Sequence, residues 1–187
     1  TATVCDEVYR TLMKMRWQPS LQIIPHYESE PLYIQAIVNS INNKLSSINW
    51  KPDLILASYH GIPKKYFDKG DPYHCYCHKT SRLIKETFKK DIPILTTFQS
   101  RFGPQEWLQP YTDKTLENLP KEGKKNILVI SPGFSSDCVE TLEEISIQGK
   151  ESFLESGGEK FDTIPCLNDN EDHIKLLVHL INKSIRK

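Results

Sequence analysis

The sequence predicts an α/β fold, with a parallel sheet of four to five strands covered by helices on both faces. Two observations support this prediction. Helical and extended hydrophobic patterns alternate along the 187 residues, and the extended runs are short and apolar, as in a buried strand. Strands separated by helices pair in parallel, because the helix returns the chain to the same end of the sheet. The length fits one domain, residues 1–187.

The first third of the chain contains two helical patterns with a short extended run between them. Val4–Met15 has apolar residues at helical spacing, and Pro19 ends the pattern. Leu21–Pro25 is predicted as a short strand. Pro31 suits the first turn of the next helix, where a missing N–H costs nothing. The apolar stripe of this helix consists of Ile34, Ile37, Val38, Ile41 and Leu45.

The remaining chain continues the alternation, with loops rich in Gly and Pro between the elements. Apolar runs of five to seven residues predict strands at Leu54–Ser58, Ile92–Phe98, Asn126–Ser131 and Phe161–Pro165. Amphipathic patterns predict helices at Cys75–Lys89, Thr112–Leu119, Glu140–Phe153 and Glu171–Ile185. No internal repeat and no glycine-rich nucleotide motif is present.

The charge balance excludes several partners. Lys plus Arg equals Asp plus Glu, at 24 each, so no basic field attracts nucleic acid. No apolar run approaches the roughly 20 residues that span a bilayer, and no signal peptide pattern is present.

Five cysteines with unpatterned spacing argue against a disulfide framework and favour a reducing, cytoplasmic location. Because the chain starts at Thr1, we expect a fragment of a longer protein.

His60 and Glu140 follow two of the predicted strands, where an open α/β sheet collects its functional groups. His60 can bind a metal or move a proton near neutral pH, or it can simply bond a backbone carbonyl at the strand end. Glu140 and Glu144 stand one helical turn apart, and their carboxylates suit divalent cations or proton transfer. The alternative is a solvated first helical turn with Asp137 as its N-cap. In the functional case, Leu142, Ile145 and Ile147 would bury part of the acidic row and raise some of its pKa values.

Two further segments carry candidate chemistry. Cys75 and Cys77, with His74 and His78 beside them, resemble a metal motif, but the second ligand pair of a zinc site is missing. The alternative is the exposed start of a helix. The loop 98–108 contains Arg101, Phe102 and Trp107. The two rings suit a flat, apolar ligand whose carboxylate would pair with Arg101. The alternative is that Phe102 and Trp107 only cover the core.

Taken together, these segments resemble ferrochelatase, the enzyme that inserts ferrous iron into protoporphyrin IX, and in particular its proteobacterial members. The resemblance covers nearly the whole chain and includes SYHGIP at 58–63, GDPY at 70–73, TFQSRFGPQEWLQPYTD at 97–113 and PGFSSDCVETLEEI at 132–145. It implies a chelatase-like three-layer αβα sandwich, one lobe of a two-lobed enzyme that holds the porphyrin between its lobes. This chain is similar to the carboxyl-terminal lobe, so the resemblance implies that the amino-terminal lobe is not included in this sequence.

The resemblance also implies roles for single residues. His60 and Glu140 match the positions usually assigned to iron binding, and Glu144 matches the next acidic group on a path for metal or protons. The positions that match those lining the porphyrin cleft are Tyr73, Arg101 and Trp107. Cys138 stands where animal members have a histidine. Other proteobacterial members also have a cysteine at this position. The tail 181–187 contains no cysteine, so we expect no [2Fe–2S] cluster.

The implied function is that of a lyase of haem biosynthesis, with Fe²⁺ as substrate metal and protoporphyrin IX as the second substrate. Its proton and metal transfers need a base and a metal donor, which His60 and the two glutamates can supply. We expect this chain to be inactive without its other lobe. A peripheral membrane contact is compatible with so hydrophobic a substrate. The alternatives are a non-catalytic tetrapyrrole or metal binding module, and a cobalt or nickel chelatase, although such chelatases typically use more site histidines.

Overall fold

A four-stranded parallel sheet forms the centre of the protein in the computed structural model, which describes residues 2–185. The strands are β1 (Leu54–His60), β2 (Ile94–Gln99), β3 (Asn126–Ile130) and β4 (Lys160–Ile164). Their order in the sheet is β2-β1-β3-β4, and every pair is parallel. The register aligns His60 with Gln99, so these two residues end neighbouring strands at the same edge.

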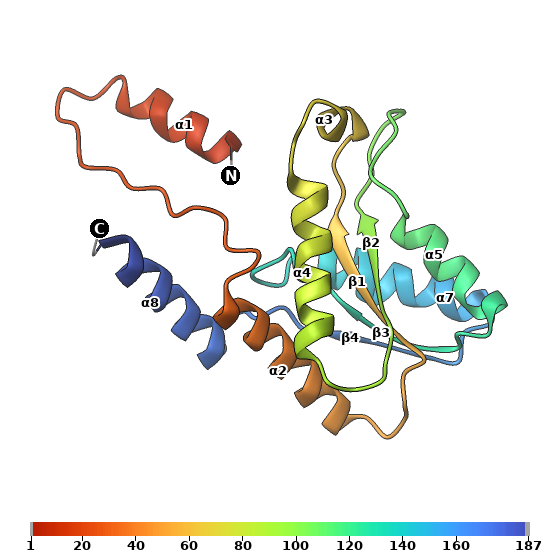
Figure 1. Cartoon of the computed structure of the whole chain (residues 1–187). Helices are drawn as coiled ribbons and strands as arrows, with labels where there is room; N and C mark the ends of the chain where they lie inside the picture. The colour runs from red at the N-terminus through yellow and green to blue at the C-terminus, as the bar shows by residue number, and fades with distance from the viewer. Residues whose placement is uncertain (1, 186–187) are drawn as a thin grey trace.

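The helices cover both faces of the sheet and give the predicted three layers (Figure 1). They are α1 (Ala2–Leu12), α2 (Pro31–Ser47), α3 (Lys64–Asp68), α4 (Tyr73–Thr87), α5 (Thr112–Asn118), the 3₁₀ turn η1 (Leu119–Glu122), α6 (Val139–Leu142), the π-helical η2 (Glu144–Gly149), α7 (Lys150–Glu155) and α8 (Glu171–Ile185). Helices α2, α4 and α8 pack on one face, and α5, η2 and α7 pack on the other.

Alternation along β1 explains the two cores. Ile55, Ala57 and Tyr59 belong to the larger cluster under α2, α4 and α8, whereas Leu54 and Leu56 belong to the cluster under α5 and α7. Successive side chains of a strand point to opposite faces. The next even-numbered residues, Ser58 and His60, therefore face the α5–α7 layer.

The predicted strand at Leu21–Pro25 is wrong. The segment has no regular structure, and Leu21 and Ile23 are exposed. A strand needs a hydrogen-bonded neighbour, and in the described part of the chain no strand pairs with this segment. Helix α1 also lies apart from the sheet and has no buried residue, although its apolar spacing predicted a helix correctly (Figure 1).

A second difference concerns Glu140–Phe153, which the pattern predicts as one helix. The segment instead forms α6, then the π-helical η2, then α7. In the π-helical part, the amide of Gln148 donates to the carbonyl of Glu143, five residues back. Such π-turns are frequent at functional sites. Helix α3 lies inside the predicted loop after His60, and β1 extends two residues beyond the predicted end. None of the helices within residues 2–185 is long and apolar enough to cross a membrane.

Glu28 anchors the segment before α2 to α4. Its carboxylate accepts hydrogen bonds from Lys79 Nζ at 3.0 Å and His26 Nδ1 at 2.6 Å. Thr80 Oγ1 donates to the Glu28 carbonyl oxygen at 2.9 Å. Burial opposes ionisation, but the hydrogen bonds from His26 and Lys79 outweigh it and hold the pKa of Glu28 at about 2 instead of 4.5.

We predict that Glu28→Gln lowers the free energy of unfolding at pH 7 by on the order of 1–2 kcal/mol. The folded-state pKa lies below the unfolded value, so this stabilisation is complete above pH 4.5 and disappears as pH falls toward 2. Urea unfolding at pH 7 and pH 3 measures the difference. Glu171→Gln, at an exposed ion pair with Lys175, serves as control. A Glu28→Gln deficit that is equal at both pH values would contradict the prediction.

Candidate active site at the strand ends

His60 ends β1 at the carboxyl edge of the sheet. A contact with the backbone of the next residue, Gly61, orients its ring. Its Nδ1 lies 2.6 Å from the carbonyl oxygen of Gly61. A carbonyl only accepts hydrogen bonds, so in the neutral ring Nδ1 carries the proton and Nε2 keeps its lone pair. The sequence left open whether His60 simply bonds a backbone carbonyl, and its Nδ1 does so. It leaves Nε2 available for a proton or a metal.

Tyr73 supports His60 from the first turn of α4. Its hydroxyl donates to the His60 carbonyl oxygen at 2.8 Å. Burial raises the pKa of Tyr73 far above its ordinary value, so the hydroxyl stays protonated and remains a donor. The structure thus shows Tyr73 in contact with the backbone of His60.

Two aromatic rings flank the imidazole. The ring centroids of Trp107 and Phe134 lie 6.4 and 6.3 Å from that of His60. Trp107 is held by a hydrogen bond from Nε1 to the carbonyl oxygen of Phe102 at 2.9 Å. The backbone also packs closely here, since a Cβ on Gly61 would lie 3.0 Å from the Gln99 carbonyl oxygen and 3.2 Å from the Trp107 ring. The flat indole therefore needs glycine at position 61.

Glu140 lies in the first turn of α6, and its carboxylate stays ionised. A hydrogen bond from the Cys138 side chain lowers its pKa most, followed by its own backbone N–H, and the charge of His60 acts in the same direction. The predicted rise of this pKa through burial is wrong. Leu142 and Ile147, which were expected to cover the carboxylates, are themselves 54% and 53% exposed.

The start of α6 is capped by Cys138, not by Asp137. The backbone N–H of Cys138 donates to Thr141 Oγ1 at 3.0 Å, and the Cys138 side chain accepts from the Thr141 backbone, which completes a capping box. Asp137 instead receives hydrogen bonds from Asn168 Nδ2 at 2.7 Å and from the Cys166 backbone at 3.2 Å. It thereby fixes the loop before α6 to the segment after β4.

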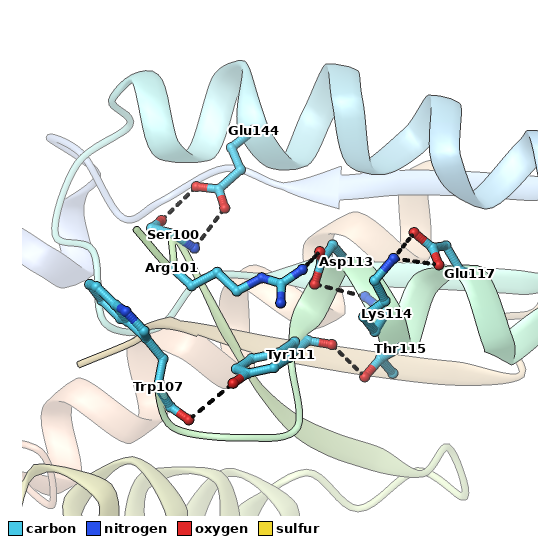
Figure 2. Close-up of polar contacts among 9 residues, drawn as sticks. All are labelled: Ser100, Arg101, Trp107, Tyr111, Asp113, Lys114, Thr115, Glu117 and Glu144. Atoms are coloured by element: carbon cyan, nitrogen blue, oxygen red, sulfur yellow. Dashed lines mark hydrogen bonds and ion pairs between the residues drawn. The ribbon is translucent and has the colours of Figure 1, made fainter. Parts of the chain in front are cut away.

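Glu144 is held by the end of β2. Its carboxylate accepts from the Ser100 backbone N–H at 2.7 Å and from Ser100 Oγ at 2.5 Å, as Figure 2 shows. Gln99 Nε2 adds a longer bond of 3.3 Å. The two glutamates therefore differ, because Glu144 is bonded to the end of β2, whereas the hydrogen bonds that lower the pKa of Glu140 come from Cys138 and from its own backbone.

Gln99 connects the histidine strand with the acidic helix, and sequence reasoning missed it. Its side chain is buried. Oε1 accepts from Ser58 Oγ at 2.7 Å, and Nε2 donates to the Glu140 carbonyl oxygen at 2.7 Å. The pattern that could have revealed it is an amide at the end of a buried strand, since a buried amide needs partners for both of its ends.

Arg101 forms a second part of the site, on the loop after β2. Its guanidinium contacts Asp113 at 2.6 Å and lies over the ring of Tyr111, 4.5 Å from the centroid (Figure 2). Arg101 and Glu144 line one cavity of about 300 Å³, together with Gln99 and Asp113. An acidic ligand at Arg101 would share the guanidinium with Asp113.

The candidate residues therefore fall into two neighbouring groups. His60, Tyr73 and Trp107 gather around the end of β1, whereas Arg101 and Glu144 line the cavity beside the end of β2. Glu140 belongs to both, since its pKa responds to His60 and its backbone is bonded to Gln99. Within residues 2–185, no group of three or more His, Cys, Asp or Glu side chains is arranged to hold a metal ion.

These features define an α/β protein with a histidine and carboxylates at the ends of parallel strands. A family model described as Ferrochelatase matches residues 1–185, and the chain belongs to this family. Among curated relatives, the ferrochelatase of Allorhizobium ampelinum is 55% identical over 188 residues, which cover 100% of this chain and 54% of that protein. The ferrochelatase of Rhizobium meliloti is 56% identical over 188 residues. This match covers 99% of this chain and 55% of that protein. The chain spans about half the length of these relatives.

We predict that the neutral imidazole of His60 is the Nδ1–H tautomer, because Nδ1 donates to the Gly61 carbonyl oxygen. The ¹⁵N chemical shifts of the imidazole measure this directly. His173 provides an internal control, since its Nδ1 lies 2.5 Å from the carbonyl oxygen of Asn168 and demands the same tautomer. An Nε2–H pattern at His60, with the expected pattern at His173, would contradict the arrangement.

Proposed function

We propose that this chain is the metal-handling part of a ferrochelatase, a lyase that inserts Fe²⁺ into protoporphyrin IX and forms protohaem. The main support is that Nδ1 of His60 is bonded to Gly61, which leaves Nε2 open, and that His60 contributes to the lowered pKa of Glu140. Family membership and the identity with named ferrochelatases support the same reaction.

The reaction requires groups of this kind. Two pyrrole N–H protons leave the macrocycle while Fe²⁺ exchanges its water for four ring nitrogens, so proton acceptors and a metal donor must act together. An imidazole with a free lone pair can accept a proton or present the metal. A carboxylate with lowered pKa can take the complementary part, because it is ionised at neutral pH. We assign these roles to His60 and Glu140 as a pair.

The surrounding residues fit a flat, hydrophobic substrate. Trp107 and Phe134 present rings beside His60, and Phe102 is 84% exposed on the same loop as Arg101. In the proposal, these rings contact the macrocycle, Arg101 pairs with a propionate, and Tyr73 positions His60 through its carbonyl. Glu144, fixed by Ser100, continues the acidic path from Glu140 toward the cavity.

The proposal includes a second lobe, because the chain spans about half of its relatives. In it, residues 1–187 form the carboxyl-terminal lobe, and an amino-terminal lobe closes the porphyrin cleft in the cytoplasm, with a peripheral membrane contact for substrate uptake. No resident [2Fe–2S] cluster is part of the proposal. A cobalt or nickel chelatase is less well supported, because His60 is the one histidine among residues 2–185 that ends a strand.

We predict that His60→Ala or Glu140→Gln in the full-length protein lowers porphyrin metallation by about 10²–10⁴-fold, as expected when a proton-transfer group is lost. Fluorescence loss of the free porphyrin under anaerobic Fe²⁺, or with Zn²⁺, measures the rate. His179→Ala, on the exposed side of α8, should retain near-normal activity. Near-normal metallation by His60→Ala would contradict the assignment.

We also predict that residues 1–187 alone do not metallate a porphyrin above the uncatalysed rate, because one wall cannot exclude water or bend the ring. The same assay on the chain and on the full-length protein, at equal concentration, tests this. Metallation by the chain at a rate within a few-fold of the full-length protein would show that the second lobe is dispensable.

A further inference from the structure

The proposed function does not use the motif His74-Cys75-Tyr76-Cys77-His78, and the structure separates its members. Cys77 is buried, and burial raises the pKa of its thiol to about 12. Cys75 is exposed. Residues two apart on a helix do not face each other, so the two thiols do not form a chelating pair.

The two histidines, in contrast, are brought together. His74 and His78 are one turn apart on α4, and their ring centroids lie 4.4 Å apart. The ring of His74 is half-buried between Phe67 of α3 at 4.8 Å and Phe98 of β2 at 5.6 Å. These two contacts fix the orientation of the His74 ring. His78, which lies beside it, is exposed.

The nitrogens of both rings are free to bind a ligand. Within residues 2–185, no hydrogen bond or ion pair joins either imidazole to another residue, whereas His26, His60, His173 and His179 each have a polar contact. Packing alone explains the half-buried ring of His74. His78 also lies near Phe98, with 6.1 Å between their ring centroids, so both imidazoles meet on one aromatic surface with no hydrogen-bond partner on their nitrogens.

Two histidines at i and i+4 on one helical face are a known arrangement for zinc. Neutral imidazole suits Zn²⁺, Ni²⁺ and Cu²⁺. Because no third His, Cys, Asp or Glu completes a cluster within residues 2–185, water would fill the other positions. The bound ion would therefore exchange readily.

The pair is also distinct from the strand-end site. Phe98, which His74 contacts, is aligned with Tyr59 and packs in the core under α4. His60 follows Tyr59 and points to the opposite, α5–α7 layer. A metal ion at His74 and His78 would thus lie on the other side of the sheet from the His60 side chain.

We propose that His74 and His78 form a second metal site, which takes a divalent late transition-metal ion of the Zn²⁺ class through two imidazoles. The site goes beyond the proposed function, because it needs neither porphyrin nor the second lobe.

Zn²⁺ titration of this chain at pH 7.5, without porphyrin, tests the proposal by following the ring Cε1–H signals of the six histidines. We expect the His74 and His78 signals to shift together along one binding curve. His78→Gln should weaken Zn²⁺ binding at His74 by about tenfold or more, since a single imidazole remains. His74→Phe keeps the ring packed between Phe67 and Phe98 while removing its nitrogens, and should weaken binding at His78 equally.

Cys75→Ser is the matched control and should leave the binding curve unchanged. The proposal is overturned if the two histidines do not shift, if they follow separate curves, or if Cys75→Ser abolishes binding. His60→Ala should leave the His74–His78 curve intact while abolishing metallation in the full-length protein. The two sites can therefore fail independently of each other.

Discussion

The buried side chain of Gln99 is the interaction on which the strand-end site depends. One amide joins three elements, because its oxygen accepts from Ser58 of β1 and its nitrogen donates to the carbonyl of Glu140 in α6. Ser58 stands two residues before His60 on the same face of the strand. A buried amide that loses a partner costs about 1–3 kcal/mol, so this geometry is strongly preferred. Gln99 thereby fixes the position of α6, which carries Glu140, relative to β1, which carries His60.

The acidic segment shows how a small change in helix geometry separates two similar residues. Glu140 and Glu144 would share one face of a regular helix and repel each other. The capping box at Cys138 and the π-helical η2 divide the segment instead. Glu144 accepts hydrogen bonds from the backbone N–H and the hydroxyl of Ser100, while Glu140 receives a hydrogen bond from Cys138, which lowers its pKa. The two carboxylates are thus held by different elements, Glu144 by the end of β2 and Glu140 by the start of α6.

Much of the fold could be predicted from the sequence, because buried strands and amphipathic helices leave local patterns. The parallel sheet, His60 near the end of β1 and Glu140 in the first helical turn after β3 follow from those patterns. The strand at Leu21–Pro25 could not be judged locally, since a strand exists only with a neighbour. The break in the helix after Glu140 and the role of Gln99 depend on long-range hydrogen bonds, which no local periodicity records.

The His74–His78 pair also shows a limit of local sequence patterns, because here the sequence offers more candidate ligands than the structure brings together. Its motif is visible in the sequence, where the two cysteines are as prominent as the two histidines. Only the helix geometry shows that Cys77 is buried while the imidazoles meet beside Phe98. Spacing identifies candidate ligands, and packing decides which of them can converge.

Hydrogen exchange in Gln99→Leu tests most directly whether this amide holds the acidic helix in place. Gln105→Leu, at an exposed loop position, is the control. We expect the amides of 139–149 to exchange at least about tenfold faster in Gln99→Leu, and to accelerate more than the amides of β3 and β4. Equal acceleration throughout the sheet and helix, or unchanged exchange in 139–149, would show that Gln99 contributes only to overall stability.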